Sequence, residues 1–187
     1  PPGWTGSGWI GQAPMSFSQR PGRSWGQFYA EHQILPYVAA ATRSGALASQ
    51  DAKSLRALAE RVSEGHFDSP QPALLEPQAA ARLHGDLWTG NVLWTEVPLQ
   101  ANQSWTGAVL IDPAAHGGHA ETDLAMLALF GLTGLDTVIA AYNEVSPLAE
   151  GWSERIGLHQ IYPLLVHAVL FGGAYGSRAA ERARNYL

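Results

Sequence analysis

The sequence predicts a mainly α-helical domain with a small β-hairpin or sheet near the middle of the chain. Two observations lead to this fold class. Apolar residues recur at helical spacing before residue 66 and again after residue 113, which is typical of helices with one buried face. Between these stretches lie short apolar runs bounded by Gly, Pro and Asn, which is the pattern of short strands. The 187 residues are enough for one domain with its own core.

Residues 1–23 are rich in Gly, Pro and Ser without sustained periodicity, so we expect irregular structure there and a helical domain over 24–187. The first helix should kink or break at Pro36, because proline cannot donate a backbone hydrogen bond. Ser49 or Asp51 is a suitable N-cap for the second helix. Helices are predicted over residues 24–45, 49–65, 122–130, 135–145 and 154–175, with a short helix closing the chain, strands over 81–83, 91–94 and 105–111, and a surface loop over 66–78.

Charge and composition exclude several classes of function. The chain has 11 Lys+Arg, a net charge of −5 and no basic run, so it lacks the electrostatic footprint of a protein that binds nucleic acid or an anionic membrane. It has no cysteine, which excludes disulfides and thiolate chemistry and suits the cytoplasm. No apolar stretch reaches the ~20 residues of a membrane span. No pattern in the sequence fixes an oligomeric state.

One segment, residues 84–91, carries the densest chemical signal (His-Gly-Asp-Leu-Trp-Thr-Gly-Asn). Asp86 is followed five positions later by Asn91, and Asp112 ends a later apolar strand. This is the layout of a kinase catalytic loop, in which a carboxylate accepts the proton of the attacking hydroxyl and oxygen ligands hold Mg²⁺ on the ATP phosphates. We therefore predict that Asp86 is the catalytic base and that Asn91 and Asp112 bind the metal. The hairpin between these ligands returns the chain to its own start, so both can reach one ion.

A structural explanation exists for each polar residue taken alone. Asp86 could cap a turn and Asp112 could end a strand, and only their common register with Asn91 favours catalysis. His116 and His119, with two nearby carboxylates at Asp112 and Glu121, could suggest a zinc hydrolase. No HExxH or comparable fixed spacing is present, so a polar loop and a helix N-cap are favoured.

Three further features of the sequence are poor indicators of a nucleotide or metal site. Residues 6–11 fit the pattern G-x-G-x-x-G, but no strand precedes them and Pro14 blocks the helix that a phosphate-binding loop needs. Lys53, the single lysine, lies in a helical pattern and is a poor candidate for the lysine that contacts ATP. His159 and His167 lie in apolar helical sequence, where histidines are more often satisfied core or groove residues than metal ligands.

The segment at 84–91 resembles a known family. It is similar to the HGDLWxGN motif of fructosamine (ketosamine) kinases, and Trp88 and Gly90 make it more specific than the HGD of choline and aminoglycoside kinases. The resemblance implies the C-terminal lobe of a protein-kinase-like fold, which uses ATP and Mg²⁺ to phosphorylate a sugar hydroxyl of ketosamines, either small molecules or glycated proteins. Further similar segments follow in the same order at residues 111–114, 118–126, 129–131, 147–155 and 160–172.

The resemblance also implies roles beyond the base and the metal ligands. Asp123 matches an aspartate that we expect to brace the catalytic loop by hydrogen bonding. Trp88 either packs beneath the loop or presents a face to the sugar ring, and His84 and Trp152 are further candidates for substrate contact. We expect Tyr162 to contribute to the same cleft, unless it forms core.

Two positions depart from the family pattern: Ala120 stands where Arg is usual, and His116 replaces an aromatic residue. In the resemblance, residues 1–23 follow the hinge after the ATP-binding lobe. We therefore expect that lobe, with its cofactor-binding residues, to be absent from this chain, and the chain alone to have little kinase activity. An aminoglycoside or choline kinase, or a non-catalytic binding domain on the same scaffold, remain the alternatives.

Overall fold

The computed structural model describes residues 6, 8–18, 22–76, 78–100 and 103–187. The helices are α1 (Trp25–Phe28), the π-helix η1 (Tyr29–Ile34), α2 (Leu35–Arg43), α3 (Ser49–Ser63), α4 (Glu121–Leu129), α5 (Leu135–Val145), α6 (Trp152–His159), α7 (Ile161–Phe171) and α8 (Tyr175–Arg184), with 3₁₀ turns η2 (Ala73–Leu75) and η3 (Thr89–Asn91). The strands are β1 (Gly8–Ile10), β2 (Ala13–Met15), β3 (Ala81–Leu83), β4 (Val92–Gln100), β5 (Gln103–Leu110) and β6 (His116–Gly118). The mainly helical fold with small antiparallel sheets confirms the predicted fold class.

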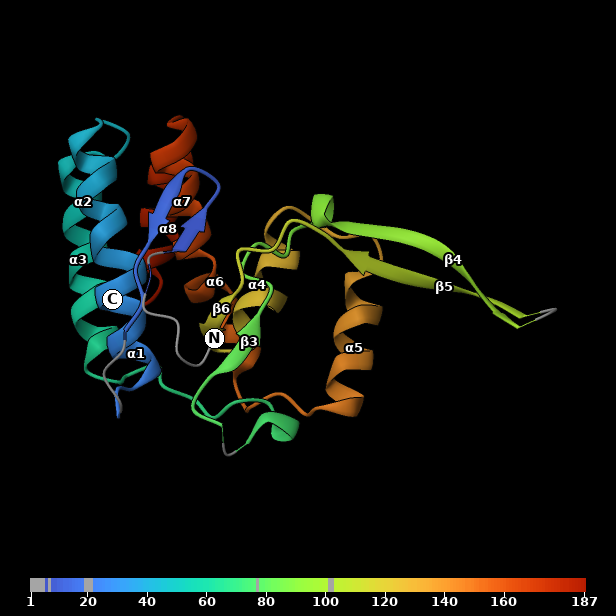
Figure 1. The fold of residues 1–187 in the computed structure, drawn as a ribbon. Coiled ribbons are helices and arrows are strands. Elements are labelled where there is room, and N and C mark those ends of the chain that lie inside the picture. The colour runs from blue at the N-terminus through green and yellow to red at the C-terminus, as the bar shows by residue number, and fades with distance from the viewer. Residues whose placement is uncertain (1–5, 7, 19–21, 77, 101–102) are drawn as a thin grey trace.

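The elements form three groups along the molecule (Figure 1). Helices α1 to α3 pack with α7 and α8 at one end, and this group holds most of the core. Helices α4 and α6 and the β3–β6 pair lie in the middle. Helix α5 and the protruding β4–β5 hairpin lie at the other end. The site residues therefore sit where the middle group meets the two ends.

The first helical stretch begins where the sequence predicts. Ser24 is the N-cap of α1, and Ser24 and Gln27 each accept a hydrogen bond from the other's backbone amide. The kink predicted at Pro36 takes the form of η1, because the wider turns of a π-helix make room for the proline ring and its missing donor. Helical structure thus continues from α1 through η1 into α2 without an intervening loop.

The prediction that Ser49 or Asp51 is the N-cap of α3 was wrong. The cap is Ala48, which makes no side-chain hydrogen bond, so the helix starts without the stabilisation expected from Ser49 or Asp51. Asp51 instead lies in the first turn and pairs with Arg184 of α8 at 3.1 Å. The contact joins two helices far apart in sequence.

Residues 8–15 correct the expectation of irregular structure over 1–23. Strands β1 and β2 form an antiparallel pair with Gly8 opposite Met15 and Ile10 opposite Ala13. Ile10, Ala13 and Met15 are buried in the main core. This burial explains the pairing, since two three-residue strands have little stability of their own.

The middle of the chain contains two further strand pairs. β3 pairs with β6, and β4 pairs with β5 so that Val92 lies opposite Leu110. This confirms the predicted hairpin, although its strands run further, to Gln100 and Gln103. The segment at 84–91 therefore connects one strand pair to the other.

The long helix predicted over 154–175 is divided in the structure. α6 ends at His159 and α7 begins at Ile161, with Gln160 between them. The Gln160 side chain donates to the carbonyl of Ala125 at 2.9 Å and accepts from Arg182 at 2.9 Å. Pro163 in the first turn of α7 has no backbone N–H to donate to the His159 carbonyl, so the helix cannot continue across this point, and the Gln160 contacts hold the break in place.

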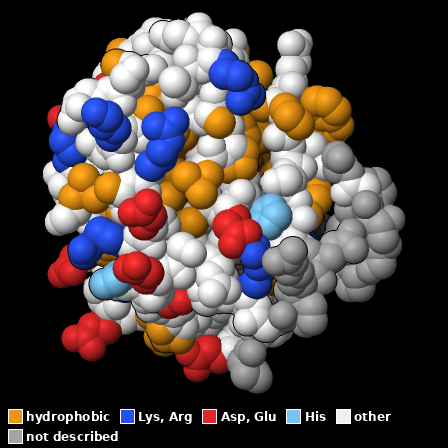
Figure 2. Space-filling view, turned by 90° about the vertical axis from the view of Figure 1, so that its left-hand side faces the viewer, with side chains coloured by type: hydrophobic (Ala, Val, Ile, Leu, Met, Phe, Trp, Pro, Cys, Tyr) orange, Lys and Arg blue, Asp and Glu red, His pale blue; other side chains and the backbone are white. Residues whose placement is uncertain are grey.

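The core and the surface agree with a folded domain. Figure 2 shows the end formed by α2 and α3, where acidic and basic side chains lie among apolar ones. Within the described residues, no helix combines the length and the apolar character needed to cross a bilayer. The largest fully buried apolar side chains include Tyr29, Ile34, Leu55, Leu58, Leu158 and Leu164, each contributing about 1.5–3 kcal/mol by burial.

Candidate active site

The loop at 84–91 is held in place by the first turn of α4. The Asp123 carboxylate accepts hydrogen bonds from the backbone amides of His84, at 2.7 Å, and Gly85, at 3.0 Å. Gly85 has a φ of +82°, and a Cβ there would lie 2.2 Å from the carbonyl oxygen of Ala114. Glycine is therefore required where the loop leaves β3.

Asp86 and Asn91 lie in direct contact. The Asn91 Nδ2 donates to the Asp86 carbonyl at 2.8 Å and to Asp86 Oδ2 at 3.2 Å. The Trp88 amide donates to the same carbonyl at 3.1 Å. Because the Asn91 amide nitrogen is used on Asp86, its amide oxygen is the atom left to face an ion.

Asp112 is brought to this loop by hydrogen bonds of the residue before it. The Ile111 amide donates to the Asn91 carbonyl at 3.1 Å, and His84 Nε2 lies 2.9 Å from the Ile111 carbonyl oxygen. Asp112 is exposed and has a φ of +51°, the one positive φ outside glycine among the described residues. Strained backbone of this kind occurs preferentially at functional sites. The structure thus gathers all three residues that the sequence singled out.

The charge on Asp86 is only partly compensated. Burial raises the pKa of Asp86, the nearby His167, the Asn91 hydrogen bond and His84 lower it, and the Asp112 charge raises it again. The net result is a pKa above the ordinary 3.8. A carboxylate with a raised pKa is a stronger base, which suits proton removal from a hydroxyl.

Asp86 lies in the wall of a pocket of about 540 Å³ between the loop at 84–91, α7 and the β1–β2 turn. This volume is typical of small-molecule sites. The pocket is largely aromatic, and its lining includes Trp88, Phe130, His167, Phe171 and Tyr175. The sequence did not single out Phe130, Phe171 or Tyr175, because aromatic residues in helical patterns more often form core.

His167 has a fixed orientation in this pocket. Its Nδ1 lies 2.7 Å from the Pro163 carbonyl oxygen, to which it donates, so Nε2 is the ring nitrogen that a ligand can meet. The ring is packed by Phe130 and Tyr175, at centroid distances of 5.2 and 5.0 Å. His167 is therefore a groove histidine, one of the two structural alternatives that its sequence context allowed.

Trp88 packs on its own loop and also lies in the wall of the Asp86 pocket. Its ring covers Gly90, where a Cβ would lie 2.3 Å from a ring carbon, and meets Phe130 edge to face at 6.1 Å. The side chain is still 38% exposed and lines the Asp86 pocket. The ring therefore shapes the loop, while part of its surface stays exposed in the pocket.

The geometry does not support three expected substrate contacts. His84 uses both ring nitrogens on backbone groups, since Nδ1 also accepts from the Asp86 amide at 3.3 Å, so its ring serves the loop. Trp152 lines a separate pocket of about 310 Å³ between α4, α5 and α6, because it starts the helix at the end remote from α7. Tyr162 is only 2% exposed and belongs to the core beside Tyr37.

The two departures from the family pattern are both buried. His116 Nδ1 donates to the Ala114 carbonyl at 2.8 Å, and its Nε2 lies 3.1 Å from Gln33 Nε2. Ala120 packs with Ala81 and Leu83 in a small apolar cluster. Neither residue points to substrate chemistry.

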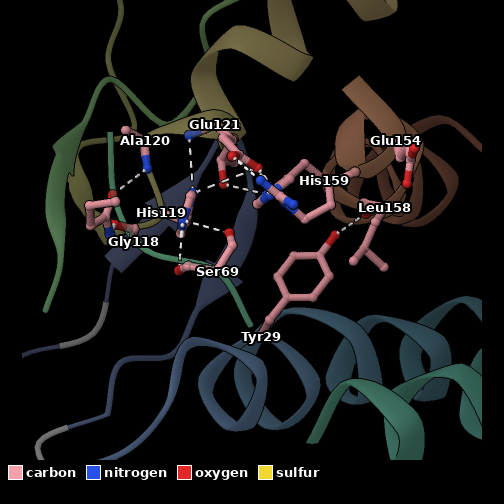
Figure 3. Close-up of polar contacts among 12 residues, drawn as sticks. Tyr29, Ser69, Gly118, His119, Ala120, Glu121, Glu154, Leu158 and His159 are labelled. Atoms are coloured by element: carbon pink, nitrogen blue, oxygen red, sulfur yellow. Dashed lines mark hydrogen bonds and ion pairs between the residues drawn. The ribbon is translucent and has the colours of Figure 1, made fainter. Parts of the chain in front are cut away.

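A second polar cluster is centred on Glu121, which is 2% exposed (Figure 3). Arg155 donates from Nε to Glu121 Oε2 at 2.9 Å and from Nη2 to Oε1 at 2.6 Å. His159 Nε2 lies 3.3 Å from Oε2 without a well-aligned hydrogen bond, while its Nδ1 lies 3.0 Å from Thr122 Oγ1. His119 Nε2 lies 3.1 Å from the Pro70 carbonyl oxygen, which fixes the ring.

This cluster has the spacing of a metal site but the charges of an ion pair. Ligand atoms of His119, Glu121 and His159 lie within 4.8 Å of one another. Arg155, however, already binds both oxygens of the carboxylate and supplies the positive charge that a metal would bring. The zinc set considered from the sequence is not assembled, since Asp112 lies near Asp86 instead. We interpret the cluster as a structural ion-pair network.

A helical lobe that presents these residues on a loop, a hairpin and a strand end has a kinase-like fold. The chain belongs to the fructosamine kinase family, whose model matches residues 2–187. It is 31% identical over 198 residues to a probable ketoamine kinase of Synechocystis, covering 99% of this chain and 55% of that protein. It is 30% identical over 164 residues to a chloroplastic protein-ribulosamine 3-kinase of Oryza sativa subsp. indica, covering 87% of this chain and 42% of that protein.

A solved structure agrees with this assignment. A candidate fructosamine-3-kinase from Thermobifida fusca is 50% identical, with a TM-score of 0.80, over 97% of this chain and 56% of that protein. The chain thus spans about half the length of the relatives that it matches.

Proposed function

We propose that this chain forms the acceptor-binding and metal-binding half of a kinase that transfers the γ-phosphoryl group of ATP to a sugar hydroxyl of a ketosamine. The observation that carries the proposal is the position of Asp86, in the wall of an aromatic pocket and in contact with Asn91. The names of the relatives, ketoamine kinase and protein-ribulosamine 3-kinase, support this choice of acceptor.

In this mechanism Asp86 accepts the proton of the attacking hydroxyl. Its raised pKa strengthens it as a base, and the Asn91 hydrogen bond to Oδ2 leaves Oδ1 to meet the hydroxyl. The Asn91 amide oxygen and the Asp112 carboxylate fit Mg²⁺, which prefers hard oxygen ligands and, when bound, neutralises charge on the ATP phosphates.

The pocket gives the acceptor its place. The exposed face of Trp88 can stack on a sugar ring, and the aromatic wall suits the positively charged amine of a ketosamine. His167 Nε2 can hydrogen-bond a second sugar hydroxyl. These contacts recognise the part that a free ketosamine and a glycated protein share.

The test uses a chimera in which the part of the Thermobifida fusca protein that this chain does not cover is joined to it. With Mg²⁺ and ATP, the chimera should phosphorylate fructoselysine in preference to choline or an aminoglycoside. The chain alone should release no ADP above background under the same conditions. Preferential phosphorylation of choline or an aminoglycoside would assign the site to another small-molecule kinase, and steady turnover by the chain alone would contradict the proposed division of labour.

A further inference from the structure

A second cavity, of about 740 Å³, lies behind the catalytic loop, between β3, α4, α5 and the start of the β4–β5 hairpin. None of its lining residues belongs to the lining of the pocket that holds Asp86. Its wall is mostly aliphatic and aromatic, including Leu83, Leu127, Val138 and Tyr142. The volume lies within the range of sites for small organic molecules.

Helix α5 is only loosely packed beside the cavity, with Leu135 and Val138 partly buried against a small cluster that includes Leu127. None of the residues of α5 is buried, although Val138 and Tyr142 face the cavity. On the opposite wall Trp94 and Leu110 are 53% and 51% exposed. Covering this apolar surface would be favourable at about 25 cal/mol per Å², so the cavity suits an apolar occupant.

Charge at the cavity defines the other end of that occupant. The charged residues in its lining are Arg82 and Asp123. The Asp123 carboxylate is already bound by the amides of His84 and Gly85. The Arg82 side chain is exposed on β3 and makes no ion pair or side-chain hydrogen bond within the part of the chain that the structure describes. Those amides use the oxygens of Asp123, so Arg82 is the charged group of the lining that is left to bind a ligand.

We propose that this cavity binds a small amphipathic carboxylate, with its apolar body between α4 and α5 and its carboxylate on Arg82. A guanidinium can bind a carboxylate through two parallel hydrogen bonds. Leu87 and Asp123 belong to the cavity wall, so the occupant touches the back of the loop that carries Asp86. The site is independent of the kinase assignment, since it requires neither nucleotide nor sugar.

The test is a titration of the chain with decanoate, followed by calorimetry and by tryptophan fluorescence, since Trp94 lies in the wall. Saturable binding of one decanoate per chain is expected, with decylamine at least about tenfold weaker because its head has the opposite charge. Arg82→Gln should weaken decanoate binding by about tenfold or more. Lys53→Gln removes the same charge on α3 and should leave binding unchanged.

A second pair of variants tests the location. Ala141→Trp adds bulk to the cavity from an exposed position of α5, and should abolish decanoate binding without disturbing the fold. Ala140→Trp, one position earlier, faces the smaller pocket between α4, α5 and α6 and should bind decanoate normally. Equal binding by the two variants, decylamine binding as tightly as decanoate, or the absence of saturable binding would overturn the proposal. Concentration-dependent dimerisation that Ala141→Trp abolishes would do so too, by assigning the apolar wall to a second copy of the chain.

Discussion

Asp86 is half-buried and Glu121 is buried, but the pKa of Asp86 is raised whereas the pKa of Glu121 is lowered. Burial raises the pKa of Asp86, and its neighbours compensate only in part. For Glu121 burial also raises the pKa, but the close approach of His159 and the two hydrogen bonds from Arg155 outweigh it and bring the pKa to about 2. A carboxylate whose charge is fully matched by protein groups holds the fold together, whereas one left partly unmatched is available for chemistry.

The largest expected effect is on the turnover of a variant at Asp86, where catalysis and stability should change in opposite directions. Asp86→Asn should lower turnover of the chimera by about 10²–10⁴-fold, because the variant cannot accept the proton. The same change should raise the melting temperature of the chain, since the ionised carboxylate is unfavourable in the folded state. Asp136→Asn, at an exposed position of α5, should change neither quantity. A stable variant with normal turnover would remove Asp86 from the mechanism.

Glu121 should show the reverse behaviour. Glu121→Gln leaves Arg155 as an unpaired and largely buried charge, so the free energy of unfolding should fall by about 3–5 kcal/mol in urea denaturation. Asp51→Asn breaks the more exposed pair with Arg184 and should cost less than about 1 kcal/mol. Equal losses in the two variants would show that the Glu121 network has no special weight.

Asp123 lies on α4, two residues after Glu121, and binds the loop that carries Asp86. Removing its carboxylate should therefore loosen that loop. Asp123→Ala deprives the amides of His84 and Gly85 of their acceptor, so those amides should exchange hydrogen faster. Turnover of the chimera should fall by roughly 10²-fold, the loss expected when a catalytic group moves by about 1 Å. Asp123→Asn retains one acceptor oxygen, so its amide exchange and its turnover should lie between those of the unchanged protein and those of Asp123→Ala. Unchanged amide exchange in Asp123→Ala would exclude the bracing role.

Changes of pH should have a smaller effect than these substitutions, and stability should fall in two steps as the pH drops. Burial lowers the pKa values of His119 and His159 below the ordinary 6.5, so the unfolded chain binds protons more readily and stability should fall as pH drops below 6.5. Glu121 should cause a second fall as pH drops from 4.5 towards 2. Asp86 acts oppositely, since its raised pKa favours the folded state at low pH. Urea midpoints measured across this range check the pattern. His159→Leu should weaken the first step and also reduce the second, because His159 helps to lower the pKa of Glu121.

Local patterns in the sequence were sufficient for several elements. The strand at Ala81–Leu83 and the helix at Leu135–Val145 have the bounds that were predicted. The loop containing Asp86 and Asn91 was identified because its chemistry is compressed into eight neighbouring positions. A pattern of that length reports on one loop, and the hairpin that follows explains the return to Asp112.

Features that depend on distant partners were not accessible in the same way. The β1–β2 hairpin forms because Ile10 and Met15 reach a core built by later helices. Arg155 lies 34 residues from Glu121, so their ion pair left no local signal. The aromatic wall around His167 was likewise hidden, because a helix that lines a groove and a helix that fills a core share one periodicity.

The π-helix η1 also sets how α1 and α2 are rotated relative to each other about the helix axis. Each α-helical residue turns the chain by about 100°, and the extra residue in a π-turn shifts the two flanking helices out of phase. On one side of it the Trp25 ring packs at a tilt against His159, and on the other Tyr37 donates to the carbonyl of Pro14 in the first hairpin. Deleting one residue from η1 would rotate one of these faces away from its partner, so the length of this segment is as constrained as its composition.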